Sequence, residues 1–269
     1  MFTINDRASN YGDGIFTTML VENGAIALFE RHISRLLMDS ERLSICVDEQ
    51  LLRNAIAHEV QVGKSGVLKL LISSGEGGRG YTRDKNKHPK LYFSWHDVPD
   101  RYASWQRKGV DIGVSHVQLA RQPLLAGCKH LNRLEQVMIK QSLAASPFDD
   151  VVVCDSDEMV VEASAANIFW FSTGSWYTPS VESSGVAGVM RGFMLDYFAQ
   201  HTRSVSICQL PISKIIDAEA VFICNALMKL VPVNKLTVAS GSTEYDCAHV
   251  INLQQAIALP FKDEYVSFG

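Results

Sequence analysis

The sequence predicts an α+β protein with mixed sheets, divided into two domains. Apolar runs of strand length outnumber the segments with helical periodicity, and several follow one another closely enough to form hairpins. Strands do not alternate regularly with helices, as they would in a doubly wound parallel sheet. The chain has 269 residues, 47% of them hydrophobic, which is enough to bury one large core or two modest ones.

The first part of the chain is expected to form a small α/β domain, residues 1–103. Two segments carry apolar residues at helical spacing on one face, and two later runs are rich in residues that favour strands. The expected elements are helices at 31–45 and 49–62 and strands at 67–73 and 91–95.

A polar segment at 97–109, which includes Pro99 and several charges, indicates a domain junction. We place an interdomain linker at 104–109 and a larger domain with a mixed sheet, which would bind the cofactor inferred below, at 110–269. Its expected strands are 110–116, 150–155, 158–162, 167–171, 175–178, 204–209, 219–225 and a short one near 230; its expected helices are 130–146, 190–201 and 243–257.

Composition excludes several classes of function. The net charge is −4, so no basic excess favours nucleic acid or an acidic membrane surface. No stretch approaches the roughly 20 apolar residues of a membrane span, and the N-terminus lacks the apolar run of a signal peptide.

The six cysteines form no Cys-x-x-Cys pair and the eight histidines no close ligand pair. We expect a cytoplasmic protein without a metal site.

A glycine-rich loop at 75–80 matches the G-x-G-x-x-G pattern of dinucleotide-binding proteins and follows a predicted strand. That fingerprint must open a helix, whereas residues 81–89 have no helical period and contain a proline. We therefore interpret 75–80 as a flexible loop that faces a substrate. Glycines let the backbone approach a ligand closely, and Arg79 and Arg83 can meet carboxylates.

Chemistry is indicated by three separate features. Lys129 follows a loop that carries Gly127, Glu162 precedes a small-residue turn and a strand, and Gly188 opens a predicted helix. A lysine amine, a carboxylate and a helix N-terminus are the groups that pyridoxal phosphate needs for its aldehyde, its pyridine nitrogen and its phosphate. Taken alone, Lys129 could equally be a solvated surface lysine, and Glu162 a surface glutamate at a strand end.

Short motifs occur in a fixed order over most of the chain, at 6–7, 11–18, 32–36, 77–81, 127–133, 162–169, 188–191 and 224–228. Together they resemble the fold-type IV pyridoxal-phosphate enzymes, which include the branched-chain and D-amino-acid aminotransferases. Lys-His-Leu-Asn-Arg at 129–133 and Gly-Gly-Arg-Gly-Tyr at 77–81 resemble the lyase branch more than the aminotransferases. Members usually carry further N-terminal strands before the motif at 6–7, so we expect either a trimmed first sheet or a displaced start.

The resemblance implies a homodimeric lyase of folate biosynthesis. Such an enzyme converts 4-amino-4-deoxychorismate to 4-aminobenzoate and pyruvate, with the cofactor at the domain interface. One alternative is a pyridoxal-phosphate aminotransferase for branched-chain or D-amino acids, and another is a non-catalytic protein that binds a small molecule. A lysine–glutamate pair argues against the second alternative, because binding alone needs no covalent bond to a lysine.

The resemblance also implies roles for individual residues. Lys129 forms the Schiff base with the cofactor and acts as the catalytic base, and Glu162 keeps the pyridine nitrogen protonated. Arg35 binds the phosphate, although Arg31 and Arg42 on the same predicted helix leave open a surface arginine there.

Further contacts to the phosphate are implied for the backbone N–H groups of Val189 and Met190. Asn225 lies where relatives have another phosphate contact; the next residue, Ala226, lacks a hydroxyl, so only its N–H or the Asn225 amide could serve. Arg79 and Arg121 are the candidates for the carboxylates of the substrate, with a solvated loop arginine as the alternative for each.

Overall fold

A computed structural model describes residues 3–60, 62–78, 80–84 and 86–268. Contacts between Cα atoms divide the chain into two compact units. Unit 1 comprises Met1–Val98, Cys128–Arg133 and Phe261–Gly269, and unit 2 comprises Pro99–Gly127 and Leu134–Pro260.

These bounds differ from the expected domains at 1–103 and 110–269. The segment around Lys129 and the end of the chain belong to unit 1, because each forms hydrogen bonds with a strand of that unit. The expected linker at 104–109 largely coincides with a helix, α4 (Arg101–Lys108), which belongs to unit 2. Its polar composition reflects an exposed helix surface, since none of its residues is fully buried.

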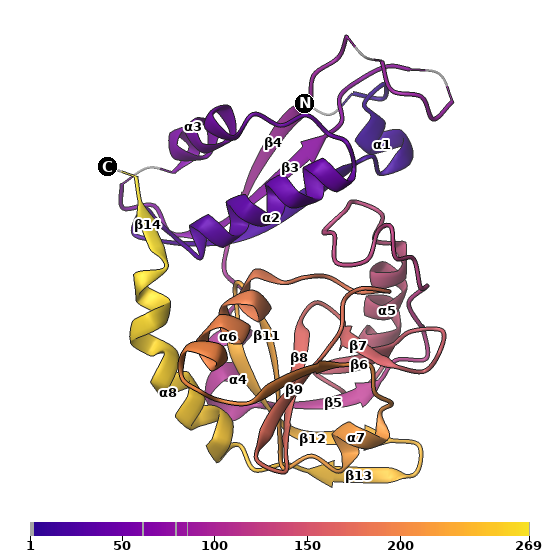
Figure 1. Ribbon diagram of the computed structural model, residues 1–269, viewed down its shortest axis with the longest axis vertical. Coiled ribbons are helices and arrows are strands. Elements are labelled where there is room, and N and C mark those ends of the chain that lie inside the picture. Colours follow the sequence, from indigo (N-terminus) through magenta and orange to yellow (C-terminus); the bar gives the residue numbers. More distant parts are fainter. Residues whose placement is uncertain (1–2, 61, 79, 85, 269) are drawn as a thin grey trace. The chain divides into compact units, whose positions relative to one another are not determined.

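Unit 1 is built on an antiparallel sheet with the strand order β14-β2-β1-β3-β4 (Figure 1). The expected helices at 31–45 and 49–62 and strands at 67–73 and 91–95 are all present. The elements are α1 (Arg7–Tyr11), β1 (Gly14–Glu22), β2 (Ala25–Ala27), α2 (Phe29–Arg42), α3 (Glu49–Glu59), β3 (Gly66–Ser73), β4 (Lys90–His96) and β14 (Tyr265–Ser267).

The core of unit 1 forms where α2 covers the sheet. Ile33 and Leu36 of α2 recur at helical spacing and are fully buried with Ile15 and Met19 of β1. Asp48, directly before α3, caps this helix: its side chain accepts the Leu51 N–H, a common way to satisfy a first-turn donor. The described residues between β3 and β4, at 74–78, 80–84 and 86–89, contain no helix, so they do not have the strand–loop–helix structure of a dinucleotide-binding fingerprint.

Unit 2 contains a mixed sheet with the order β10-β9-β8-β11-β12-β5-β6-β7, and β13 pairs with β12. The pairs β9/β10, β5/β12 and β5/β6 are parallel and the others antiparallel, which confirms the α+β class with a mixed larger sheet. Its elements besides α4 are β5 (Val110–Val114), α5 (Leu134–Ala144), β6 (Asp150–Cys154), β7 (Val160–Ala163), β8 (Asn167–Ser172), β9 (Ser175–Pro179), α6 (Val189–Gln200), β10 (Val205–Cys208), α7 (Ser213–Ile216), β11 (Ala220–Asn225), β12 (Lys229–Val238), β13 (Gly241–Glu244) and α8 (Ala248–Asp263), whose last residues lie in unit 1.

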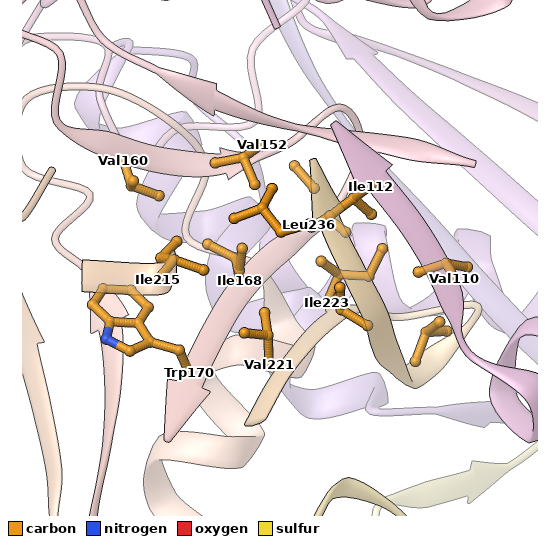
Figure 2. Close-up of a cluster of buried hydrophobic side chains, with 14 of the residues drawn as sticks. Val110, Ile112, Val152, Val160, Ile168, Trp170, Ile215, Val221, Ile223 and Leu236 are labelled. Atoms are coloured by element: carbon orange, nitrogen blue, oxygen red, sulfur yellow. The ribbon is translucent and has the colours of Figure 1, made fainter. Parts of the chain in front are cut away.

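Both faces of this sheet are covered. Ile168 and Trp170 of β8 lie with Ile223 in one apolar cluster, which Figure 2 shows. The alternate residue, Phe169, stacks on Phe222 at 4.8 Å between ring centroids and belongs to the opposite face. α6 packs on that second face, where Phe198 contacts Phe169. Gly188, directly before the helix, lies against the side chain of Asn167 at the start of β8.

Three expectations for unit 2 are wrong in detail. The helix predicted at 130–146 begins only at Leu134, because Lys129 and Leu131 form backbone hydrogen bonds with β1 and His130 forms a bridge with it. The short strand near 230 is instead the ten-residue β12, which continues into β13, and the helix predicted at 243–257 begins only at Ala248, because 243–244 belong to β13. Of the helices among the described residues, none is both long and apolar enough to cross a membrane.

Candidate active-site residues

The backbone around Lys129 is fixed within unit 1. Its N–H donates to the buried carboxylate of Asp39 at 2.9 Å, and its carbonyl accepts the N–H of Phe16 at 3.0 Å. The side-chain nitrogen lies 4.4 Å from the centroid of the Phe16 ring. The amine therefore extends from a rigid backbone along an aromatic face, where a cation is favoured and the surroundings are partly apolar.

Arg35 lies on the buried face of α2 and is 6% exposed, so the alternative of a surface arginine is wrong. Its guanidinium donates to the Thr17 hydroxyl at 2.6 Å, and that hydroxyl lies 2.6 Å from His32 Nδ1. Arginine can only donate, so the Thr17 oxygen accepts from Arg35. The direction of the hydrogen bond between the Thr17 hydroxyl and His32 depends on the tautomer of the histidine ring.

The charges around these residues are mostly positive. Burial, together with Arg35 and Lys129, holds the pKa of His32 well below its usual value. Burial also lowers the pKa of Arg35 to about 10, although the nearby Asp39 opposes this shift and Arg133 adds to it. A buried region with this excess of positive charge is suited to an anion.

Unit 2 contributes a buried carboxylate. Glu162, at the end of β7, is 6% exposed, which excludes the alternative of a surface glutamate. One of its oxygens accepts the N–H of Val186 at 3.0 Å. Gly185, which has a positive φ of 82°, packs so closely that a Cβ atom there would lie 2.5 Å from the Val161 side chain and 3.3 Å from the carboxylate. The loop before α6 therefore lies directly against Glu162.

Asn167 fixes the turn that leads into α6. Its amide donates to the Val186 carbonyl at 2.9 Å, and a Cβ atom at Gly188 would lie only 2.1 Å from its side-chain oxygen. α6 begins after Gly188 with no side-chain cap, and its first N–H groups, including those of Val189 and Met190, have no acceptor within the helix.

The Asn225 side chain is occupied by its own turn. Its amide donates to the Ala165 carbonyl at 3.0 Å, and its oxygen accepts the N–H groups of Leu227 and Met228, each at 2.9 Å. A phosphate contact at this strand end would thus come from the backbone N–H of Ala226. Direct binding of the phosphate by Asn225 stays a prediction, and the structure shows its side chain fixing the turn that contains Ala226.

The arginines considered as ligands for the substrate carboxylates differ in their surroundings. Arg121 forms an ion pair with Asp157, lies 3.9 Å from Asp155 and donates to the Ser183 hydroxyl, so its role as a substrate ligand stays a prediction. Arg83 pairs with Asp13 at 2.6 Å and donates to two backbone carbonyls, which gives it a structural role within unit 1. Arg79 lies outside the described residues.

The chemistry of these donors fits pyridoxal phosphate. Unit 1 contains the amine of Lys129 and the buried guanidinium of Arg35, which suit the aldehyde and the phosphate. Unit 2, taken by itself, contains the buried carboxylate of Glu162 and the N–H groups at the start of α6, which suit the pyridine nitrogen and the phosphate. Among the described residues, no three metal-binding side chains are grouped to hold a metal ion.

Sequence reasoning missed Thr17, His32 and Asp39. His32, Arg35 and Asp39 are three and four residues apart on α2, among the buried apolar residues of the same face. Polar residues at helical spacing on an otherwise apolar face would have been the signal for them. Thr17 gave no such signal, because its partners lie on α2, which is distant from β1 in sequence.

Comparisons with known proteins agree with this chemistry. The family model for amino-transferase class IV matches residues 14–236. The chain is 33% identical over 244 residues to aminodeoxychorismate lyase from Vibrio harveyi, with 90% of each chain covered. The crystal structure of 4-amino-4-deoxychorismate lyase from Pseudomonas aeruginosa is similar with a TM-score of 0.88 and 31% identity, over 96% of this chain and 94% of that one. A putative branched-chain-amino-acid aminotransferase from Methanocaldococcus jannaschii is 24% identical over 237 residues, covering 86% of this chain and 81% of the relative.

Proposed function

The chain belongs to the amino-transferase class IV family, whose enzymes use pyridoxal 5'-phosphate, and on that premise we propose that it is a lyase of folate biosynthesis. Its substrate in this proposal is 4-amino-4-deoxychorismate, and its products are 4-aminobenzoate and pyruvate. The observation that carries the proposal is the identity of 33% and 31% to two lyases of that name over at least nine-tenths of each chain, against 24% to the aminotransferase described above. The likeness over the whole chain also confirms the expected fold-type IV class.

We infer that Lys129 has two duties. Pyridoxal phosphate, when bound, supplies an aldehyde that bonds to amines and a ring that accepts electrons. Lys129 holds the cofactor until the substrate amine replaces it, and its freed amine then removes the proton from the carbon that carries the substrate nitrogen. Because both backbone groups of Lys129 are hydrogen-bonded, the amine can move between these duties only by rotation of its own side chain.

The remaining residues bind and orient in this proposal. Glu162 stabilises a protonated pyridine nitrogen and is itself held in place by the Val186 N–H. Arg35 and the N–H groups of Val189 and Met190 hold the phosphate. Loss of the enolpyruvyl group then leaves an aromatic ring, and the leaving group gains a proton to become pyruvate.

The lyase reaction needs no second substrate, because all atoms of the products come from one molecule of 4-amino-4-deoxychorismate. The purified protein with pyridoxal phosphate should therefore form 4-aminobenzoate and pyruvate in equal amounts without any keto acid. Product formation is followed by fluorescence of 4-aminobenzoate and by enzymatic assay of pyruvate. Absence of both products, with amino transfer from a branched-chain or D-amino acid to a keto acid, would instead establish the aminotransferase alternative.

The contact between Thr17 and Arg35 leads to a specific prediction. Thr17→Val keeps the shape of the side chain but removes the oxygen that accepts from Arg35 and that forms a hydrogen bond with His32 Nδ1. We expect the cofactor Kd to rise about tenfold, the effect of one lost hydrogen bond to a charged group. Absorbance titration with pyridoxal phosphate measures this, and kcat at saturating cofactor should change little.

Thr17→Ser is the matched control, because it keeps the hydroxyl. Its affinity for the cofactor should stay near that of the wild type. If the valine and serine variants bind the cofactor equally well, the hydroxyl does not position Arg35 for binding.

We also propose a homodimer, on the basis of an exposed apolar face of α5. Leu134, Val137 and Met138 lie at spacings of three and four residues and are all exposed in the single chain. Three large apolar side chains grouped on one helix face are typical of an interface. A second copy of the chain is the partner that the family resemblance suggests.

Val137→Glu is expected to shift this dimer toward the monomer, because it would bury a charge against apolar side chains. Light scattering at micromolar concentration should give the mass of two chains for the wild type and a lower mass for the variant. Leu259→Glu, which changes an exposed leucine of α8, is the control and should leave the mass unchanged. A wild-type mass of one chain would refute the dimer.

A further inference from the structure

Arg191, in the first turn of α6, is a buried cation that forms no ion pair with a carboxylate among the described residues. It is 7% exposed, and its described hydrogen bond goes from the guanidinium to the Pro179 carbonyl at 2.9 Å. Its Nε has no hydrogen-bond partner among the described residues. A buried charge is normally paired with an opposite charge, because burial without one is unfavourable. Arg191 therefore lacks the compensation that its position requires.

The position of Arg191 makes this lack more pronounced. The N-terminus of a helix carries a partial positive charge, so it repels a cation in the first turn. This repulsion adds to the cost of burying the charge away from water. Burial lowers the pKa of Arg191, with only the Cys224 thiol acting in the opposite direction. Both effects would be relieved by an anion near the start of α6.

The elements around Arg191 are those expected to hold a phosphate. Gly188 and the free N–H groups that follow it begin the same helix turn. α6 also packs against β11, whose last residues Cys224 and Asn225 directly precede Ala226. Cys224 pairs across the sheet with Asn167, whose oxygen packs against Gly188. The helix turn that carries Arg191 thus contains one backbone segment predicted to face the phosphate, and its helix packs on the strand that leads to the other.

We propose that Arg191 is a second cation, besides Arg35, that binds the phosphate of the cofactor, acting by charge from behind the first turn of α6. The inference rests on the cofactor site proposed above and adds a residue to it. It also accounts for why this chain keeps a buried arginine where a neutral side chain could donate equally well to the Pro179 carbonyl.

The test compares pyridoxal phosphate with pyridoxal, which lacks the phosphate. Both carry the same aldehyde for Lys129, so the ratio of their dissociation constants reports on the phosphate contacts alone. Arg191→Gln keeps an amide donor for the Pro179 carbonyl but removes the charge, and Arg191→Lys keeps the charge. We expect the glutamine variant to lose about tenfold in this ratio, as expected for one unit of charge acting at short range in a partly buried site. The lysine variant should keep most of the ratio.

Arg31→Gln is the matched control, because Arg31 has a carboxylate partner in Glu264 at 2.8 Å. Its ratio should equal that of the wild type. A purely structural role of Arg191 would weaken both ligands equally, so an unchanged ratio in Arg191→Gln overturns the inference. If that variant does not fold, a tenfold loss of the ratio in Arg191→Lys overturns it. Failure of the wild-type protein to bind pyridoxal phosphate at all would instead refute the proposed cofactor site.

Discussion

Lys129→Ala is expected to abolish turnover, with kcat reduced by more than about 10³-fold. The substitution removes both the amine that holds the cofactor and the base that moves the proton, and proton transfer by a positioned side chain alone contributes about 10²–10⁴-fold. The fold should persist, because the backbone contacts of residue 129 to Asp39 and Phe16 do not involve the side chain. Formation of 4-aminobenzoate measures the loss.

Reduction with borohydride identifies the lysine independently of activity. The wild-type protein loaded with pyridoxal phosphate should carry the reduced cofactor on the peptide that contains Lys129. Lys235→Ala is the control, because Lys235 lies on β12 close to Asp111 and should neither carry the label nor affect the rate. A label on another lysine, or substantial activity in Lys129→Ala, would refute the assignment.

Glu162→Gln is expected to lower kcat by about 10²-fold, the usual loss when one fixed electrostatic contact is removed from an active site. A neutral amide cannot stabilise a protonated pyridine nitrogen. Its oxygen can still accept the Val186 N–H, so the loop before α6 should keep its conformation. The cofactor Kd should change much less than kcat, because the phosphate contacts are not altered.

The control for this prediction is Glu158→Gln, in the turn between β6 and β7, where the side chain is exposed. Its kcat should match that of the wild type. If Glu162→Gln keeps full activity, Glu162 does not face the pyridine nitrogen. If it instead loses the cofactor altogether, its role lies in folding of the loop.

The sequence was sufficient for the fold class and for most elements, because hydrophobic periodicity is a local property. The strands at 167–171 and 219–225 and the helix at 190–201 lie within a residue or two of their observed bounds. The helix predicted from residue 130 failed for a non-local reason. Residues 129–131 pair with β1, more than a hundred residues earlier in the chain, and no local sequence pattern indicates that pairing.

The same distinction holds for the candidate site. Lys129, Glu162 and Gly188 stand in recognisable motifs, and the structure shows the last two connected through the Val186 loop. Thr17 and Arg191 could not be inferred, because each acquires its significance from burial and from a partner on another element. Arg83 shows what a motif does not reveal, since its guanidinium pairs with the carboxylate of Asp13 within the same unit.

The two hydrogen bonds that fix the backbone of Val186 limit how the sequence of this protein can change. Its N–H is held by Glu162 and its carbonyl by Asn167, while Asn167 also restricts residue 188 to glycine. A substitution at any one of these positions therefore changes the background in which the others are tolerated. We expect strong epistasis among positions 162, 167 and 188, so that sequence drift in this loop proceeds through coordinated replacements and not through independent single steps.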